Sequence, residues 1–399
     1  IYLGELDMKP AEAMIQILQD MSRLVVCDSS SKKVIAKTDD YNFAEPMVRL
    51  EILAKKLAPK IDRHFSGNHV LGANTISMSK VGQELVQTMR VIQDIYQQYP
   101  THQLSPHVEV FMDCFKRTGM YRPDVFMTPF RSVPLPSNAD EVLNRFVYEM
   151  RVRFNETEFK QTERRHRRTV KQNLAGLNSY INGLFVHYPK MRVVRIDLSY
   201  LNTCSKGYKV LRDLETLKIV EYGDVRHHRE KLIASLGDSL FKEDLAGYAW
   251  SLKNSFVGGY NIHLIVFLKE SSVDLAQDGE KSEVSFNPNI GETIANKIGE
   301  KWMSITNNLG LYYHNAQGKN HSFRSCGTGV VQADNKHDRH LLRRAAEYMI
   351  KPDLFIKYVV RKDIAQSTKV PEEKVKNNDR TFGKGSLPKG DKVKSKIKD

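Results

Sequence analysis

The residues of this sequence best suited to act together in catalysis are one histidine in an apolar segment and a closely spaced tyrosine and lysine. His263 lies in YNIHLIVFLK (260–269), and Tyr348 and Lys351 form a Y-x-x-K within EYMIK. Together these groups suit phosphoryl transfer: the tyrosine is the nucleophile, the histidine and a carboxylate hold a metal, and the lysine offsets negative charge. Such chemistry requires elements that bring the three side chains to one end of a sheet.

Two strands are expected to form one wall of this site. In a strand over 260–269 the side chains alternate, so Asn261 and His263 share a face with Ile265 and Phe267. A second strand, MRVVRIDLSY (191–200), places Arg195 and Asp197 on one face in the same way. A charged pair in so apolar a strand serves either a functional site or a structural salt bridge.

A helix over 336–351, ended by Pro352, is expected to form the facing wall. Leu341, Ala345 and Tyr348 follow helical spacing, which directs Tyr348 toward the sheet, with Lys351 one turn further on. A core tyrosine with a hydrogen-bonded hydroxyl and a structural strand histidine would give the same pattern. Spacing alone does not decide between these interpretations.

Composition restricts the class of protein. The 399 residues are 41% apolar, enough for one large domain or two, and the net charge of +14 points to a polyanion, either nucleic acid or an acidic membrane surface. No apolar run has the length of a membrane span, and the start does not have the pattern of a signal peptide. Four scattered cysteines without a C-x-x-C pair indicate neither a disulfide framework nor a zinc site. We therefore expect a reduced cytoplasmic protein that is not bound to membranes.

The N-terminal part is expected to be an all-α module over 1–122. Helical patterns cover 10–26, 44–57, 78–99 and 106–118, and polar stretches such as SGNHVLGAN separate them. Four prolines then interrupt both helix and strand, which predicts a connector over 123–136. The sequence of this module suggests no catalytic role, and binding to DNA, to a host replication protein or to a second copy all remain open.

A long helical tract follows from residue 137, with a break expected near Asn155. It contains ERRHRRTVK (163–171), a segment of closely spaced cations that fits a phosphate-contacting surface. A solvated helix with Glu156, Glu158 and Glu163 as counter-charges is the alternative. The residues proposed to contact phosphate are Arg164, Arg165, Arg167, Arg168 and Lys171.

The remaining elements predict an α+β fold over 137–364. A charged helical pattern covers 223–250, a helix covers 289–305, and CGTGVV (326–331) reads as a strand edge, so strands and helices alternate around one sheet. Beyond residue 364 the composition becomes basic and poor in apolar residues, which predicts a mobile tail over 365–399 that anchors to nucleic acid.

Read in order, these segments resemble the inovirus-type gene-two replication protein family, with its YagK/YfjJ-type C-terminal domain, and more remotely the HUH-type rolling-circle replication initiators. The resemblance covers residues 174–389. The matching segments are VVRIDLSY, NIHLIVFL, IGEKWMSITNNLGLYYHN, GTG followed by Asp334, EYMIK, and RTFGKG at 380–385. The short motifs are common individually, but their ordered set is fairly specific.

The resemblance implies an HUH-like antiparallel sheet with packed helices and a metal-dependent DNA endonuclease that nicks and joins single strands. Tyr348 would form a 5′-phosphotyrosine, Lys351 would be its electrostatic partner and His263 a metal ligand. HUH proteins usually carry a second histidine where this sequence has Asn261, whose carbonyl oxygen binds magnesium or manganese more weakly. Asp197 could supply the missing affinity. Arg195, Arg380 and Lys384 would contribute to DNA binding.

The expected role is replication initiation for a phage, satellite or other mobile element, acting on single-stranded or origin DNA. Two alternatives remain open. One is a DNA-binding protein without catalysis, whose HUH site has degenerated at Asn261, and the other is a nuclease effector in phage conflict. Tyr358, ten residues after Tyr348, is a candidate second nucleophile in the style of two-tyrosine initiators, although a continuous helix would turn it away from the first.

Overall fold

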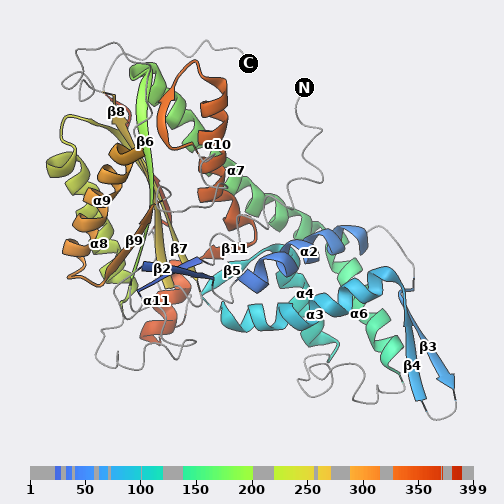
Figure 1. Cartoon of the computed structure of the whole chain (residues 1–399). Helices are drawn as coiled ribbons and strands as arrows, with labels where there is room; N and C mark the ends of the chain where they lie inside the picture. The colour runs from blue at the N-terminus through green and yellow to red at the C-terminus, as the bar shows by residue number, and fades with distance from the viewer. Residues whose placement is uncertain are drawn as a thin grey trace.

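The structure, a computed structural model, describes most of the chain (Figure 1). One large antiparallel sheet carries helices on both faces, and a mainly helical N-terminal part lies beside it. The predicted α+β class is therefore confirmed. The described residues are 23–27, 33–37, 41–57, 63–70, 73–99, 101–119, 138–200, 220–255, 259–270, 288–314, 327–369, 371 and 380–388. The connector expected over 123–136 lies outside them.

The central sheet is built around β6 (Lys190–Tyr200) and β8 (Gly259–Lys269), two long strands rich in β-branched and other apolar residues. The strand order is β10-β6-β8-β7-β12, and every pair is antiparallel. On the outer edge of β6, β10 (Gly329–Gln332) and β9 (Gly310–His314) pair with successive parts of the strand. On the other side, β7 (Leu245–Ser255) and β12 (Phe382–Lys384) follow β8.

The two faces of the sheet pack against different helices, as the alternating apolar side chains of β8 require. Ile262 and Leu264 pack in the core formed with α8 (Tyr222–Ser235) and α9 (Pro288–Ile305). Ile265 and Phe267 pack in the core formed with α7 (Thr157–His187) and α10 (Lys336–Ile350). Figure 1 shows α8 and α9 on one side of the sheet and α7 and α10 on the other. The strands predicted over 191–200 and 260–269 and the helix over 336–351 are confirmed.

The N-terminal part is not all helical, which corrects one prediction. α2 (Tyr41–Leu57), α3 (Lys80–Gln98) and α4 (Pro106–Arg117) confirm three of the expected helices. However, β3 (Phe65–Val70) and β4 (Ala73–Met78) form a hairpin from the stretch expected to be a linker, and Phe65 anchors it in the helical core. A second antiparallel pair joins β1 (Arg23–Cys27) to β2 (Lys33–Lys37). The helix predicted over 10–26 is therefore wrong at residues 23–26, and its earlier residues lie outside the described part of the chain.

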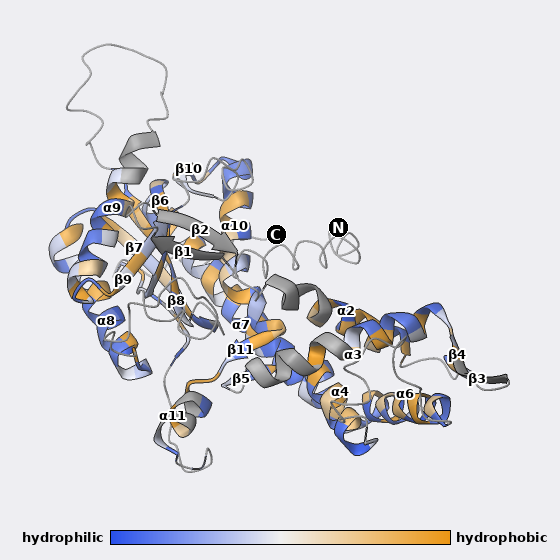
Figure 2. Ribbon diagram, turned by 60° about the horizontal axis from the view of Figure 1, so that its bottom comes forward, coloured by the Kyte–Doolittle hydropathy of each residue, from blue (hydrophilic) through white to orange (hydrophobic). Residues whose placement is uncertain are grey.

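α6 (Ala139–Asn155) belongs to the N-terminal core, since its buried side chains, such as Phe146 and Met150, pack with those of α2 and α4. The expected break follows immediately, because Glu156 has extended backbone between α6 and α7. Figure 2 shows hydrophobic and hydrophilic residues alternating along α6, as in a helix with one buried side. Phe159 of α7 still packs in the N-terminal core, whereas Val170 packs against the sheet, so the change of core comes within α7 and not in the connector.

Two further predictions need correction. The helix expected over 223–250 ends with α8 and the short π-helix η3 (Leu236–Leu240), and the final residues of that range belong to β7. Part of the expected mobile tail is ordered: α11 (Val360–Thr368) continues from β11 (Ile356–Tyr358), and β12 adds RTFGKG to the sheet. β11 pairs with β5 (His102–Leu104), and this pairing ties the C-terminal part to the N-terminal part.

Candidate functional site

The sheet face under α7 and α10 changes from apolar to polar along its length. Val193, Ala249 and Ile265 lie in the core, and the next positions of the same strands are charged or polar. Register places Asp197, His263 and Ser251 in one row across β6, β8 and β7. Because side chains two positions apart share a face, this row and its neighbours form a polar cluster at one end of the sheet, lined by Arg195, Asp197, Ser251, Lys253, Asn261 and His263.

His263 and Asp197 are in direct contact, as their predicted positions on neighbouring strands allow. Nδ1 of His263 lies 2.6 Å from Oδ1 of Asp197. The His263 side chain is 5% exposed, while that of Asp197 is 30% exposed. Burial would raise the pKa of Asp197, but His263 and Arg195 outweigh it and hold this pKa below its ordinary value. Asp197 is therefore a carboxylate that accepts from Nδ1–H, which leaves Nε2 as the ring atom that a ligand could approach.

Tyr348 lies against this pair, so the helix and the sheet meet as predicted. Its ring centroid is 5.3 Å from that of His263 in an edge-to-face arrangement, and the guanidinium carbon of Arg195 lies 5.0 Å from the Tyr348 ring centroid. Tyr348 is 9% exposed. Leu342, rather than the predicted Leu341, joins Ala345 in the core, which rotates the buried side of α10 slightly from the expected stripe.

Asn261 contributes an unusual polar atom to the same face. Its Oδ1 is buried and has no hydrogen-bond partner among the described residues, as is also true of Ser251 Oγ. A buried acceptor without a partner carries a free-energy penalty, which a ligand or ion would relieve. Imidazole nitrogen and amide oxygen can both bind a divalent cation such as Mg²⁺ or Mn²⁺. Within the described part of the chain, no three His, Cys, Asp or Glu side chains gather at one point, so Asn261 would have to bind the ion beside His263, with Asp197 behind the histidine ring.

Lys351 begins the 3-10 helix η7 (Lys351–Leu354), directly after α10. Its ammonium pairs with Glu347 at 2.8 Å. The structure therefore brings Tyr348, His263 and Asp197 together, whereas Lys351 is engaged by the Glu347 carboxylate in the last turn of α10. Arg195 is the cation that lies over the tyrosine ring.

A buried ion pair that sequence reasoning missed lies beside this cluster. Lys253 of β7 pairs with Asp353 of η7, and both side chains are about one-tenth exposed or less. Register places Lys253 opposite Asn261. Alternation in 246–253 carries the signal, because Tyr248, Trp250 and Leu252 face one core while Ala249, Ser251 and Lys253 face the other. The charged residues before it, however, also fit the helix predicted over 223–250.

The proposed DNA-contacting cations occupy different environments. Arg164, Arg168 and Lys171 are exposed on α7 and, with Lys160, follow a spacing of four and three residues along one side of the helix. Arg167 pairs instead with Glu51 of α2 and with Glu163, so it joins α7 to the N-terminal core. Arg380 is exposed just before β12, and the Lys384 ammonium lies 4.9 Å from the Tyr180 ring centroid.

Tyr358 lies away from this cluster. It is buried in β11, where its ring contacts those of Tyr222 and Tyr260 in the core on the α8 and α9 side of the sheet. The helix that carries Tyr348 ends at Ile350, close to its expected end, and Tyr358 lies on a separate strand. Tyr348 is consequently the tyrosine that faces His263.

A model of the YagK/YfjJ C-terminal domain family matches residues 153–384, which is more than half of the chain. The chain therefore belongs to this family. The matched region begins at the end of α6 and ends with β12, so it contains the whole central sheet with α7 and the polar cluster. No curated protein and no solved structure gave a significant match.

Proposed function

We propose that this YagK/YfjJ-type protein is a metal-dependent endonuclease that nicks and joins single-stranded DNA, with Tyr348 as its nucleophile. The proposal rests mainly on one observation, the edge-to-face contact of Tyr348 with the His263 ring, whose Nδ1 is held by Asp197. The sequence likeness to inovirus-type gene-two proteins and HUH-type initiators supports a role in starting replication of a phage, satellite or other mobile element. Origin DNA and host replication proteins are the corresponding partners.

In the proposed reaction the Tyr348 oxygen attacks a phosphodiester phosphorus and the bond from phosphorus to the 3′ oxygen breaks. The phenol loses a proton and the departing 3′ oxygen gains one, so protons balance, and the 5′ phosphate stays covalently on the tyrosine. Attack by a 3′ hydroxyl on this phosphotyrosine reverses the step and joins two ends. The positive charge of Arg195 beside the ring favours both the phenolate and the phosphate it attacks.

The divalent cation would be held by Nε2 of His263 and the amide oxygen of Asn261. The Asp197 carboxylate, predicted from the sequence as a ligand, accepts from Nδ1 on the other edge of the ring and would support His263 from behind. When bound, such an ion polarises the scissile phosphate. The protein's own contribution is to fix the ligands before substrate arrives: β6 and β8 hold Asp197 and His263 in register, and the hydrogen bond between them sets the imidazole tautomer.

Incubation of the protein with labelled single-stranded DNA and Mn²⁺ tests the proposal. We expect a covalent protein–DNA band on a denaturing gel that disappears in Tyr348→Phe. The matched control is Tyr358→Phe, which removes a hydroxyl from another buried tyrosine and should keep the band. If the wild-type protein gives no band with any origin-derived DNA, the nickase is wrong and DNA binding without catalysis is favoured.

That second function has one observation in its favour. The candidate metal site relies on Asn261 at the position where HUH proteins usually carry a second histidine, and an amide oxygen binds a divalent cation more weakly. A nuclease effector in phage conflict would use the same chemistry as the nickase and would differ in the DNA it attacks.

A further inference from the structure

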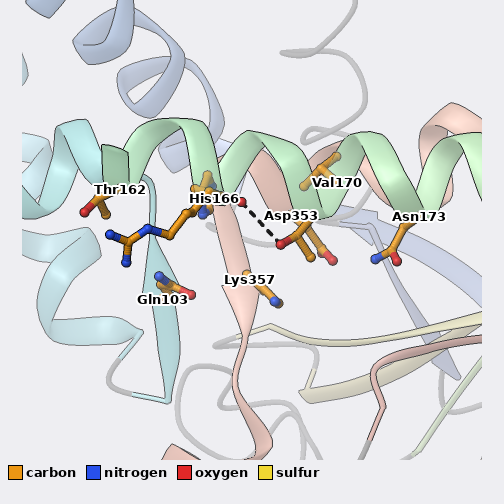
Figure 3. Close-up of a pocket in the computed structure, with 9 residues that line it drawn as sticks. Gln103, Thr162, His166, Val170, Asn173, Asp353 and Lys357 are labelled. Carbon is orange, nitrogen blue, oxygen red and sulfur yellow. Dashed lines mark hydrogen bonds between the residues drawn. The ribbon is translucent and has the colours of Figure 1, made fainter. Parts of the chain in front are cut away.

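A pocket of about 260 Å³ lies beside the polar cluster, between α7 and the paired strands β5 and β11. Figure 3 shows Gln103, Asp353 and Lys357 beside α7, the helix that carries His166 and Asn173. We propose that this pocket binds one nucleotide of a single DNA strand, with its phosphate held by Arg165 and Lys357. The inference deepens the proposed function, on which the identification of the strand as substrate rests.

The charge of the pocket favours an anion. Arg165 and Lys357 line it, and Lys357 has no hydrogen-bonded or ion-paired partner in the described part of the chain. In β11 the neighbours of Lys357 are buried and Lys357 is half-buried, so alternation directs its side chain toward the pocket. Asp353 also lines the pocket, but Lys253 neutralises it. Two cations therefore face the space without a compensating carboxylate.

The remaining lining groups suit a base and a sugar. A carbonyl oxygen can only accept, so Nε2 of His166 must donate to the Leu354 carbonyl, 2.9 Å away. Burial lowers the pKa of His166, which keeps it neutral and leaves Nδ1 as an acceptor. The amides of Gln103 and Asn173 both donate and accept, and Val170 provides an apolar wall. Such a mixture of donors, acceptors and apolar surface is typical of nucleotide recognition rather than of a simple phosphate site.

Size and position favour a nucleotide within a strand. At about 260 Å³ the pocket is slightly smaller than the range of about 300–1,000 Å³ usual for drug-sized ligands. It therefore suits one nucleotide unit and not a longer segment of the strand. Its Asp353 pairs with Lys253, which lies opposite Asn261 in the sheet, so one ion pair separates the pocket from the proposed nicking site. On its other side, the exposed cations Arg164 and Arg168 flank Arg165 on α7. A DNA backbone can follow these cations and place one nucleotide in the pocket.

Binding without chemistry provides the test. The double variant Arg165→Gln/Lys357→Gln is made in a Tyr348→Phe background, and binding of a fluorescent single-stranded oligonucleotide is measured by anisotropy in EDTA. We expect affinity to fall at least about tenfold and the slope of log K against log salt to decrease in magnitude by about 0.7, the value for one phosphate contact on single strands. The matched control, Lys231→Gln/Lys242→Gln, removes two exposed lysines from the α8 side of the sheet and should change affinity less than about twofold.

Equal oligonucleotide affinity of the pocket variant and the control would overturn the inference. So would a result in which the pocket variant loses binding of a mononucleotide but binds the oligonucleotide as well as the control does. Arg165→Gln alone, at an exposed position, is the second variant if the double variant unfolds. Because neither metal nor Tyr348 takes part, loss of binding in the pocket variant together with no covalent band from the wild type would reject the nickase and keep the pocket. A covalent band from the wild type together with unchanged DNA binding by the pocket variant would keep the nickase and reject the pocket.

Discussion

Nδ1 of His263 and Oδ1 of Asp197 lie 2.6 Å apart, on residues that face each other directly across β6 and β8. Antiparallel register makes this contact independent of loops, since both side chains arise from paired backbone positions on two neighbouring inner strands. The ring of Tyr348 then packs on the histidine from α10. The proposed nucleophile and the candidate metal-binding histidine are thus fixed by the sheet and by α10, the rigid support that catalytic groups generally require.

Loss of charge at Asp197 should impair nicking. Asp197→Asn keeps an oxygen that can accept from Nδ1 of His263 but removes the carboxylate charge, and changes at groups that hold or support metal ligands typically reduce affinity or activity 10–100-fold. We expect a reduction of that order in covalent-complex formation at limiting Mn²⁺, partly restored by excess metal. His263→Ala should abolish the complex. Single-strand binding in EDTA should be unchanged in both variants, and unaltered nicking by His263→Ala would remove His263 from the site.

The buried pair of Lys253 and Asp353 should contribute strongly to stability when only one partner is removed. Asp353→Asn leaves a buried ammonium without its counter-charge, and breaking such pairs costs about 3–5 kcal/mol. We expect a loss of this size in urea unfolding, most of it recovered in Lys253→Met/Asp353→Leu.

Glu84→Gln is the control for this pair, because its partner Lys56 is about half exposed and Glu84 itself about one-third exposed. It should change the free energy of unfolding by less than about 0.5 kcal/mol. An equally small effect of Asp353→Asn would show that water reaches Lys253 and that η7 is not held to the sheet by this ion pair.

The sequence was sufficient for the strands that carry His263 and Asp197, because both strands show clear alternation of two faces. It also directed Tyr348 toward the sheet. The pair of Lys253 and Asp353 could not be predicted from the sequence. The segment that forms β7 also fits a charged helical pattern, and Asp353 reaches β7 only because the chain turns into η7 at Pro352. Pairings between segments far apart in sequence, such as β12 with β7 and β5 with β11, leave no local pattern to detect.

The exposed cations on α7 should determine much of the salt dependence of DNA binding. Arg164, Arg168 and Lys171 share one side of the helix, and each phosphate contact on a single strand adds about 0.7 to the slope of log K against log salt. We expect the triple Gln variant to lower the magnitude of that slope by about 2 in an anisotropy titration. A Lys231, Lys242 and Lys297 triple Gln variant, with the same loss of charge on the opposite side of the sheet, should leave the slope nearly unchanged. Equal salt slopes for the α7 variant and the control variant would mean that these three side chains are solvated and do not contact DNA phosphates.

His102 should make the protein lose stability on acidification. Burial lowers its pKa from 6.5 to about 4, and its Nε2 donates to the Asn254 carbonyl at the end of β7. Between these pH values the unfolded chain binds more protons than the folded one, so stability falls as pH drops from about 6.5 toward 4. At about 1.4 kcal/mol per pKa unit, the wild type should lose roughly 2 kcal/mol more than His102→Gln between pH 7 and pH 5.

Urea unfolding at the two pH values measures this difference. His337→Gln is the control, because His337 is exposed on α10, and it should follow the wild type. Identical pH dependence of the His102 variant and the wild type would mean that His102 is protonated in the folded protein, with a changed contact between β5 and β7.

Mass spectrometry of the covalent complex tests the central claim most directly. After reaction with a short single-stranded oligonucleotide and Mn²⁺, nuclease and trypsin digestion should leave a nucleotide on the peptide 345–357, which contains Tyr348 and excludes Tyr358. We predict that fragmentation places the added phosphate on Tyr348. A nucleotide on any other tyrosine, or none on the protein while the DNA is cleaved, would contradict the account.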